Sequence, residues 1–319
     1  MKNILVIGSS GFLGSALVRE LARRPCHPGA SRGSAVRVDT AAHNSQFTLP
    51  TRREAGAKHL TVLPTACVVK CDVHDPATLA RLMAGQDAVI SLVGILKGGE
   101  GEPYGKGFAR AHVELPQKIA NAAKAAGVRR VLHVSALKAA ADAPSGYLRS
   151  KAAGEAALQA AGLDLTLFRP SVIFGRGDSF LTLFARMAKI APFFPLAGAA
   201  ARFQPVWVED VVAAVADSLE RAESIGKTYD LCGPTQYALA DLVRYATAVS
   251  GHGRAVIGIP EAIGWLQAWA MEFIPNGPLT RDNIRSMRVP SVCDAGCGLP
   301  FGRTATALES IAPTYLRDG

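Results

Sequence analysis

Short apolar runs alternate with helical patterns through the first half of the chain. Continuously apolar segments bounded by glycine or polar residues are typical of buried strands, and such segments lie at 4–7, 67–70, 88–93, 131–134 and 165–168. Apolar residues at helical spacing predict helices between them, at 12–22, from 76 onward, at 109–126 and at 147–161. Strands that are apolar on both faces need helices on both sides. The pattern therefore predicts an α/β fold with a Rossmann-type, doubly wound parallel sheet.

The second half has a less regular pattern. Its spacing predicts helices at 179–190, 209–222, 238–250 and 262–273, with extended segments at 203–208 and 228–231. We therefore expect a Rossmann domain over 1–175 and a smaller C-terminal lobe over 176–319, from which residues 203–231 return to the sheet. Residues 27–46 are rich in Gly, Ser, Ala and Asn, which predicts a surface insertion.

The charge balance narrows the range of partners. The 319 residues include 35 Lys and Arg against 26 Asp and Glu, a net charge of +9. Such a charge suits nucleic acid, an anionic lipid surface or a phosphate-bearing small molecule. No dense basic cluster with interleaved aromatics is present, so nucleic acid is not expected. No signal or transit peptide is visible, and the apolar segment 262–275 is shorter than the roughly 20 residues of a membrane span.

The six cysteines, at positions 26, 67, 71, 232, 293 and 297, lack the usual spacing of a metal site. The pairs Cys67/Cys71 and Cys293/Cys297 are separated by three residues, whereas most zinc sites have two. We therefore expect neither a metal nor a disulfide, but reduced thiols that pack as small hydrophobic side chains. Reduced thiols are typical of a cytoplasmic protein.

A glycine-rich loop directly follows the first predicted strand. Its glycines have the spacing G-x-x-G-x-x-G: the first allows a sharp turn, the second lets the backbone approach a pyrophosphate, and the third lets the next helix pack closely. That helix presents free N–H groups and its positive dipole end to the phosphates. The position between a strand and a helix predicts a dinucleotide site formed by Gly8, Ser9, Ser10, Gly11, Phe12, Leu13 and Gly14.

Two registers compete for the second strand, and they predict different cofactors. If residues 35–39 form the strand, Asp39 stands at its end and would hold the ribose 2′-OH of NAD(H). If residues 47–53 form its end, Arg52 and Arg53 stand there instead. A guanidinium is a planar, multidentate partner for the 2′-phosphate of NADP(H). We favour the second register and therefore NADP(H), with NAD(H) as the alternative.

Tyr147 and Lys151 are four residues apart at the start of a predicted helix, so they share one face. A cation at that spacing favours the phenolate and lowers the pKa of the phenol from its ordinary value of about 10. The ammonium can also hold ribose hydroxyls. This pattern predicts a catalytic acid–base Tyr147 with Lys151 beside it. The preceding strand ends at Ser135, whose hydroxyl is a candidate donor to a substrate carbonyl.

Together these residues resemble the extended or atypical branch of the short-chain dehydrogenase/reductase superfamily. The resemblance implies an oxidoreductase of the NAD-dependent epimerase/dehydratase type, acting on a hydrophobic carbonyl or hydroxyl compound or a quinone. It also implies further cofactor contacts where this chain matches the family: at the adenine side, beside the glycine loop and at the nicotinamide end. These are Asp72 and Val73, then Leu92, Val93 and Gly94, and finally Pro170, Ser171 and Val172.

A closer resemblance covers nearly the whole chain outside 27–46. Segments 47–53, 92–95, 111–116, 147–155 and 279–284 are similar to the NADPH-binding accessory subunit of respiratory complex I (NADH:ubiquinone oxidoreductase) and its bacterial relatives. This likeness implies a catalytically silent, NADPH-binding structural or assembly factor as an alternative function. A module that senses the NADPH level for a partner is a third hypothesis.

Two departures from the extended family bear on catalysis. Ala136 stands where the family carries a second hydroxyl that acts on the substrate carbonyl, and His112 replaces the asparagine of the proton relay. His112 is either a substitute for that asparagine or a packed core residue. These positions favour the silent alternative, whereas Tyr147 and Lys151 favour the enzyme.

The C-terminal lobe carries two features that suggest a partner. Trp265 and Trp269 are four residues apart and, with Phe193, Phe194 and the positive charge, are typical either of an interfacial anchor or of a core or pocket wall. A respiratory complex or the inner face of a membrane is therefore a candidate partner. The adjacent Arg281 and Asp282 are either a partner contact or an internal pair.

Overall fold

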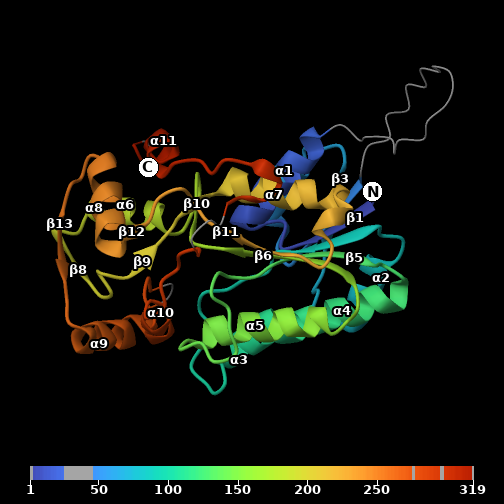
Figure 1. Ribbon diagram of the computed structural model, residues 1–319, viewed down its shortest axis with the longest axis horizontal. Coiled ribbons are helices and arrows are strands. Elements are labelled where there is room, and N and C mark those ends of the chain that lie inside the picture. Colours follow the sequence, from blue (N-terminus) through green and yellow to red (C-terminus); the bar gives the residue numbers. More distant parts are fainter. Residues whose placement is uncertain (1–2, 25–45, 275–276, 295–297, 318–319) are drawn as a thin grey trace.

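The computed structural model describes residues 3–24, 46–274, 277–294 and 298–317. Its centre is a seven-stranded sheet in the order β11-β6-β5-β4-β1-β2-β3 (Figure 1). Every neighbouring pair of strands in it is parallel. The predicted Rossmann-type α/β sheet is therefore confirmed. Its strands are β1 (Asn3–Ile7), β2 (Gln46–Thr51), β3 (Ala66–Lys70), β4 (Ala88–Ser91), β5 (Arg130–Val134), β6 (Asp164–Pro170) and β11 (Thr228–Leu231).

The strand order reverses at β1. The chain first moves outward from β1 to β2 and β3, and then returns to the other side of β1 as β4, β5 and β6. The carboxyl ends of β1 and β4 therefore flank a switch point, which is where open α/β sheets bind their ligands.

The pairing of β1 with β2 decides between the two predicted registers. Ile4 is opposite Phe47, and β2 ends at Thr51, so Arg52 and Arg53 follow the second strand of the sheet. The register that places two arginines at this strand end is confirmed. The alternative strand at 35–39, with Asp39, and the predicted insertion at 27–46, apart from its last residue, lie outside the described residues.

Helices cover both faces of the sheet, because β1 has apolar side chains on both of its faces. Ile4 and Val6 belong to one hydrophobic core, whereas Leu5 and Ile7 belong to a second core on the opposite face. Two helices contribute to the first core, α1 (Phe12–Arg23) and α7 (Val208–Glu220). Three helices contribute residues to the second core: α2 (Pro76–Met83), α4 (Leu115–Ala126) and α5 (Gly146–Gln159). They lie together on one side of the sheet in Figure 1.

The single helix predicted at 109–126 is interrupted. A short α3 (Lys106–Phe108) continues through a π-helical turn, η2 (Ala109–Glu114), into α4. Pro116 at the start of α4 has no N–H to donate to a preceding carbonyl, which accounts for the irregular turn. The helix ends at Gly127, as predicted, because this residue has a φ of +72°.

The remaining elements are short and mostly belong to the C-terminal part of the chain. Two hydrophobic clusters of this part lie apart from the two cores of the sheet, one around Phe174 and Leu242 and one around Phe194 and Val243. The elements are η1 (Glu54–Leu60), β7 (Ile173–Phe174), α6 (Leu181–Ala188), β8 (Phe193–Leu196), β9 (Arg202–Phe203), β10 (Val206–Trp207), η3 (Ala222–Ser224), β12 (Tyr237–Ala238), α8 (Leu239–Val249), β13 (Ala255–Gly258), α9 (Glu261–Glu272), α10 (Arg281–Ser286), η4 (Pro300–Gly302), α11 (Leu308–Ile311) and α12 (Pro313–Leu316).

One disulfide corrects the prediction that all cysteines are free. Cys232 and Cys293 are bonded, with their Cα atoms 6.1 Å apart. The partners are 61 residues apart in sequence, so no local spacing signals the pair. The fold brings them together because Cys232 follows β11, while Ser291 beside Cys293 accepts a hydrogen bond from Ser171 at the end of β6. Cys67 and Cys71 are free, as predicted.

Candidate functional site

The glycine loop has the shape of a phosphate cradle. Gly8 has a φ of +94°, and its carbonyl oxygen accepts a hydrogen bond from the N–H of Gly11. This oxygen lies so close to α1 that a Cβ on Gly14 would be 2.2 Å from it. The first turn of α1 has no acidic residue and no side-chain cap on its N–H groups. The hydroxyl of Ser9 is fully buried and has no hydrogen-bond partner in the described part of the chain. Uncapped donors and an orphaned hydroxyl fit a dinucleotide pyrophosphate at this position.

The rest of the predicted loop lies as the motif requires. Ser10 and Gly11 are exposed, while the partly buried Phe12 and Leu13 pack against the core of the sheet. The loop also touches the predicted 92–94 segment, since a Cβ on Gly8 would lie 3.2 Å from backbone atoms of Leu92 and Val93. The structure therefore brings these two predicted cofactor segments together at the switch point.

The predicted adenosine end lies at the carboxyl ends of β2 and β3. Arg52 and Arg53 are exposed. The hydroxyl of Thr51 donates a hydrogen bond to Arg53 O and accepts one from the N–H of Arg53. Asp72 forms an ion pair with Arg110 at 3.4 Å, and the adjacent Val73 packs against the second core. Burial lowers the pKa of His74, and the charges of Arg110, Lys118 and Arg52 add to this effect. The charge of Asp72 opposes these three cations, which together still leave an excess of positive charge that suits a phosphate.

Lys151 is almost fully buried on α5 and points at the backbone around the switch point. Its Nζ donates to the carbonyl oxygens of Val134, at 3.2 Å, and Val93, at 3.4 Å. A Cβ on Gly94 would lie 3.3 Å from this Nζ, so a side chain at 94 would require the ammonium to move slightly. Burial lowers the pKa of Lys151 to about 8, against the opposing charge of Glu155. Lys151 therefore joins the predicted 92–94 segment to the end of β5.

Tyr147 lies one helical turn before Lys151 among aromatic rings. Its ring meets those of Phe108 and His112 edge-on, at centroid distances of 6.0 and 5.6 Å. Burial raises the pKa of the phenol to about 12. The prediction that Lys151 lowers this pKa is wrong for this structure, because desolvation dominates and the ammonium is bonded to two carbonyls instead. Tyr147 is therefore a protonated hydroxyl at neutral pH.

Ser135 has the free hydroxyl that the predicted donor to a substrate carbonyl requires. It is buried, its N–H donates to Phe168 O at 2.7 Å, and its hydroxyl has no partner among the described residues. Ala136 packs with Ala143 and Leu148 beside Tyr147 and supplies no hydroxyl. The free hydroxyl in this stretch thus belongs to Ser135.

His112 is a packed structural residue. Its Nε2 accepts from the N–H of Ile95 at 3.0 Å, and its Nδ1 lies 2.9 Å from Ser150 Oγ. Because Ser150 Oγ donates its proton to Tyr147 O, His112 carries its proton at Nδ1. Burial lowers its pKa to about 2, with Lys151 contributing. Of the two alternatives for His112, the structure supports the packed residue, which links the 92–95 segment to α5.

The predicted nicotinamide-end segment joins the sheet to the C-terminal part. Pro170 O accepts from Leu137, two residues after Ser135, and Ser171 Oγ donates to Ser291 O at 2.7 Å. Val172 O accepts from Val206, at the parallel contact between β7 and β10. This segment therefore lies beside Ser135 and leads into the elements after residue 175.

Asp282 is the residue that sequence reasoning left unresolved. It is buried, and its carboxylate accepts from the N–H groups of Gly146, at 2.7 Å, and Tyr147, at 3.1 Å. It is thus an internal contact that caps the N-terminus of α5. Thr280 and Asn283 form a capping box that begins α10, a local signal that identifies the helix but not its distant partner. The neighbouring Arg281 pairs with Glu272 at 2.8 Å.

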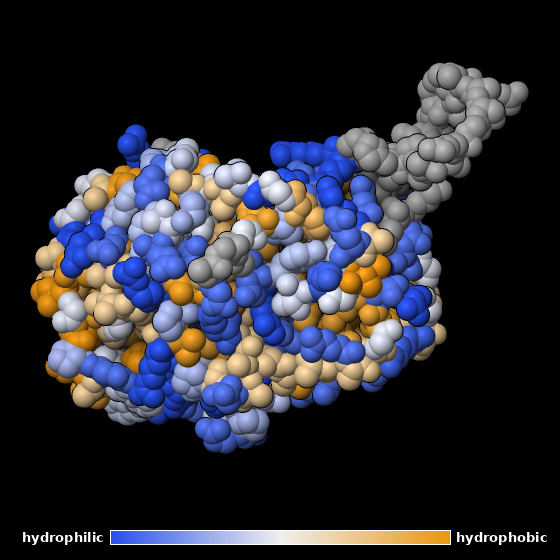
Figure 2. Space-filling view, in the orientation of Figure 1, coloured by the Kyte–Doolittle hydropathy of each residue, from blue (hydrophilic) through white to orange (hydrophobic). Residues whose placement is uncertain are grey.

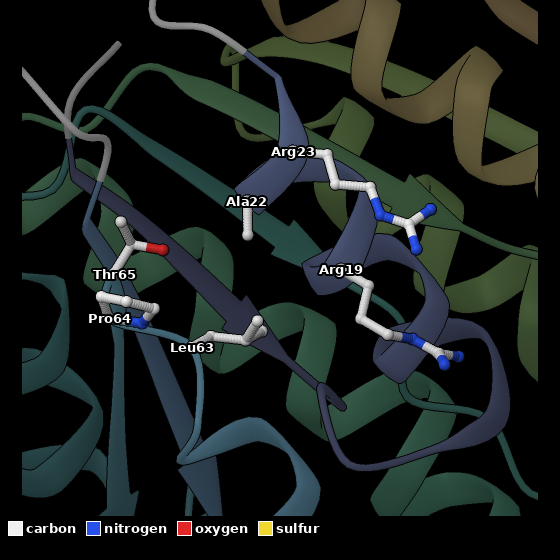
Figure 3. Close-up of a pocket in the computed structure, with 6 residues that line it drawn as sticks. All are labelled: Arg19, Ala22, Arg23, Leu63, Pro64 and Thr65. Atoms are coloured by element: carbon white, nitrogen blue, oxygen red, sulfur yellow. The ribbon is translucent and has the colours of Figure 1, made fainter.

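Two cavities differ in their relation to these residues. One, of about 420 Å³, is lined by residues that include Phe108 and Asp282, both of which contact Tyr147. The other, of about 320 Å³, lies between α1 and the turn before β3, and no predicted site residue lines it. Figure 3 shows that the Arg19 and Arg23 side chains on its rim point away from Pro64 and Thr65.

Neither a metal site nor a membrane span is found in the described part of the chain. No three His, Cys, Asp or Glu side chains gather there as a metal ion would require. None of the helices in those residues has the length and apolar character needed to cross a bilayer.

Comparisons with known proteins agree with this architecture. The rat mitochondrial NADH dehydrogenase [ubiquinone] 1 alpha subcomplex subunit 9 is 32% identical over 246 residues, covering 75% of this chain and 59% of the rat protein. The ceramide reductase of Caulobacter vibrioides is 32% identical over 210 residues, covering 66% of this chain and 58% of that protein. This chain therefore spans about three fifths of the length of either relative.

A solved structure shows the same fold over almost the whole chain. The NADPH-dependent quinone oxidoreductase of Escherichia coli, complexed with NADPH, superposes with a TM-score of 0.74 at 22% identity, covering 98% of this chain and 99% of that one. The profile of the NAD dependent epimerase/dehydratase family matches residues 4–232. The chain belongs to this NAD dependent epimerase/dehydratase family.

Proposed function

We propose that this protein is an NADP(H)-dependent oxidoreductase that reduces a hydrophobic carbonyl compound or a quinone. The observation that carries the proposal is the position of Lys151, whose buried ammonium lies between Val93 and Val134 at the switch point, one turn from Tyr147. A buried lysine of lowered pKa beside a buried tyrosine, at the end of the sheet where such folds bind their ligands, is typical of a functional site.

The residues divide the work by their chemistry. The bound nicotinamide supplies or accepts a hydride. Tyr147, with a pKa of about 12, keeps its proton at neutral pH and can give it to a substrate oxygen, which favours reduction. Lys151 remains largely cationic below pH 8 and holds ribose hydroxyls. The unpartnered hydroxyl of Ser135 is suited to donate to the same substrate oxygen.

The preference for NADP(H) rests on the end of β2. Arg52 and Arg53 are exposed there, and Arg52, Arg110 and Lys118 add to the burial that lowers the pKa of nearby His74, against the opposing charge of Asp72. A 2′-phosphate gains from such an environment, whereas a bare ribose has no carboxylate partner among the described residues following β2 except Glu54, which belongs to η1. The proposal assigns the nucleotide to residues 1–175 and the substrate to 176–319. Within the second range, residues from Val206 to Leu231 return to the first core of the sheet, as expected for 203–231, whereas two other clusters lie apart from it.

A silent structural function is the second candidate. Ala136 carries no hydroxyl, and His112 is held by Ile95 and Ser150, so neither supports the proton relay of an active family member. The likeness to a mitochondrial NADH dehydrogenase subunit supports the same candidate, with a respiratory complex as partner.

Titration of the purified protein with NADPH and NADH, followed by addition of quinones and short carbonyl compounds, separates the two candidates. We expect NADPH to bind more tightly, and Arg52→Ala to abolish that preference while Arg186→Ala does not. An enzyme oxidises NADPH as the acceptor takes up a hydride and a proton. Tyr147→Phe should stop this oxidation, whereas Tyr245→Phe should not, because it removes a hydroxyl that has no hydrogen-bond partner among the described residues. NADPH that stays bound but unreacted with every acceptor would favour the structural candidate.

A further inference from the structure

The outer face of α9 is apolar and exposed. Ile263, Leu266, Trp269 and Phe273 follow one side of the helix, and the side chains of Leu266 and Phe273 are 64% and 73% exposed. The charged residues of α9 are Glu261 and Glu272, which stand at its two ends. A helix face in water is normally polar, so this face has the composition of a contact surface.

The helix is held firmly by its inner face. Gly264 and Ala268 are buried, and a Cβ on Gly264 would lie 2.6 Å from Ala197 Cβ, so the packing is close. The guanidinium of Arg285 lies 5.1 Å from the centroid of the Trp265 ring. Glu261 and Glu272 form ion pairs with Arg288 and Arg281. The apolar face is therefore a fixed feature of the fold rather than a frayed helix end.

The strands before α9 extend the apolar surface. Phe193 on β8 and Ile257 on β13 are exposed, the two strands are paired, and Gln267 of α9 donates to Pro195 O of β8. Figure 2 shows hydrophobic residues gathered at the end of the molecule formed by β8 and β13. We call the exposed residues Ile190, Phe193, Ile257, Ile263, Leu266, Trp269 and Phe273 the apolar end.

The segments around the apolar end are basic. Neither 179–208 nor 242–260 contains an acidic residue. Arg186 and Lys189 lie just before β8, and Arg254 precedes β13, with its Nε bonded to Ala188 O. A second copy of this chain would bring the same basic rim against itself, which is repulsive. An anionic lipid surface matches both the apolar face and the basic rim.

A cavity connects the apolar end to the wall of the candidate site. The 420 Å³ cavity is lined by Met271, Phe273 and Ile274 at the end of α9 and by Phe108. Charged residues also line it: Lys97, Glu100, Glu272 and Asp282. The ring of Phe108 stacks on His112 at 5.5 Å and meets Tyr147 edge-on. The cavity therefore lies between the apolar end and the residues around Tyr147, and its mixed lining of apolar and charged side chains suits an amphiphilic molecule.

We propose that the apolar end docks on an anionic phospholipid bilayer and that the substrate is an amphiphile drawn from it. Its reducible head group faces Tyr147, and its hydrocarbon tail lies over Phe108 and between Met271 and Phe273 toward the bilayer. The substrate class rests on the proposed oxidoreductase function, whereas the docking surface does not.

Vesicle flotation of the full chain with NADPH tests the docking surface. We expect binding to vesicles of phosphatidylcholine with phosphatidylglycerol, and weaker binding to phosphatidylcholine alone. Leu266→Glu should lower the partition coefficient about tenfold, because it places a charge in the apolar face. Val62→Glu is the matched control, since Val62 is exposed as Leu266 is but lies in the sheet half, and it should bind as the wild type does.

Two further measurements keep the outcomes distinct. Light scattering that finds a dimer dissociated by Leu266→Glu, with no vesicle binding by the wild type, would overturn the lipid surface in favour of a second copy. Oxidation of NADPH is then compared for one quinone with a short soluble tail and one with a long tail in anionic vesicles. We expect Leu266→Glu to lose only the gain from the long tail. If the soluble quinone is reduced but the protein never binds vesicles, the lipid inference fails and the oxidoreductase function stands. If the protein binds vesicles but oxidises NADPH with neither quinone, the docking surface stands and the oxidoreductase function fails.

Discussion

The sheet half and the C-terminal lobe differ in how they dispose of apolar side chains. In the sheet half, β1, β4 and β5 are buried on both faces, and the large apolar residues exposed among its described positions, Val62, Leu96 and Ile225, are far apart in the chain. In the lobe, exposed apolar residues gather on α9, β8 and β13. The first region completes its own core, whereas the second leaves a surface that only a partner can cover.

The two regions also differ in what holds them together. The sheet half is built from short-range strand–helix units stacked on one sheet. The lobe is fastened to it by contacts between distant residues: the Cys232–Cys293 disulfide, the Ser171–Ser291 hydrogen bond and the Asp282 cap on α5. Breaking these tethers should therefore affect the lobe most, and local changes in the glycine loop should affect the sheet half most.

Reduction of the disulfide should have the largest effect on stability. Opening a loop of 61 residues restores conformational freedom to the unfolded chain and lowers the free energy of unfolding by about 4 kcal/mol. Denaturant titration with and without dithiothreitol measures this difference. The double variant Cys232→Ser/Cys293→Ser is the control, because it should unfold at the same point under both conditions. If dithiothreitol does not change the unfolding transition of the wild-type protein, the Cys232–Cys293 bond is contradicted.

Gly14→Ala should have the next largest effect, confined to the sheet half. Its Cβ would lie 2.2 Å from Gly8 O and 2.7 Å from Ser9 Cα, so backbone must move. We expect a loss of about 3 kcal/mol in unfolding free energy and of NADPH binding. Gly56→Ala is the matched control, because a Cβ there meets nothing within 4 Å. Equal melting curves for the two variants would show that the close helix–strand packing is not required.

The same difference explains what could be predicted from the sequence. The parallel sheet, its helices and the glycine loop follow from patterns that span a few residues, since each strand is buried by its neighbours in the chain. The positions of Gly8, Gly14, Tyr147 and Lys151 at one sheet edge follow from that topology alone.

Long-range contacts were beyond such reasoning. The partner of Cys232 is 61 residues away, and Asp282 caps a helix 135 residues earlier in the chain. The sign of the Tyr147 pKa shift also depended on the tertiary structure, because spacing places Lys151 on the same helix face but does not reveal burial or the carbonyls that bind the ammonium. Desolvation is a property of the packed site and cannot be read from an i, i+4 pair.

Lys151 predicts a pH dependence of stability in the unliganded protein. Its ordinary pKa is 10.5, and burial lowers the value in the folded chain to about 8. Between these values the unfolded chain binds the proton that the folded chain has lost, so stability rises with pH from 8 to 10, by about 2 kcal/mol. The raised pKa of Tyr147 opposes the rise only above pH 10. Lys151→Met should remove the increase in denaturant titrations at pH 7 to 10; a parallel rise in that variant would assign it to another group.

Asp282→Asn is the smallest of these changes and tests the link between the two regions directly. The carboxylate accepts from two N–H groups at the start of α5, whereas an amide offers one accepting oxygen and no charge to the positive helix end. We expect a loss of about 1 kcal/mol in unfolding free energy. Asp142→Asn, in the exposed turn before α5, should change stability by less than about half of that. Because the cap holds the N–H of Tyr147 itself, Asp282→Asn should also slow NADPH oxidation while leaving the NADPH dissociation constant unchanged. An equal loss in both measurements would mean that Asp282 supports the whole nucleotide site, and that the lobe does not act on Tyr147 in particular.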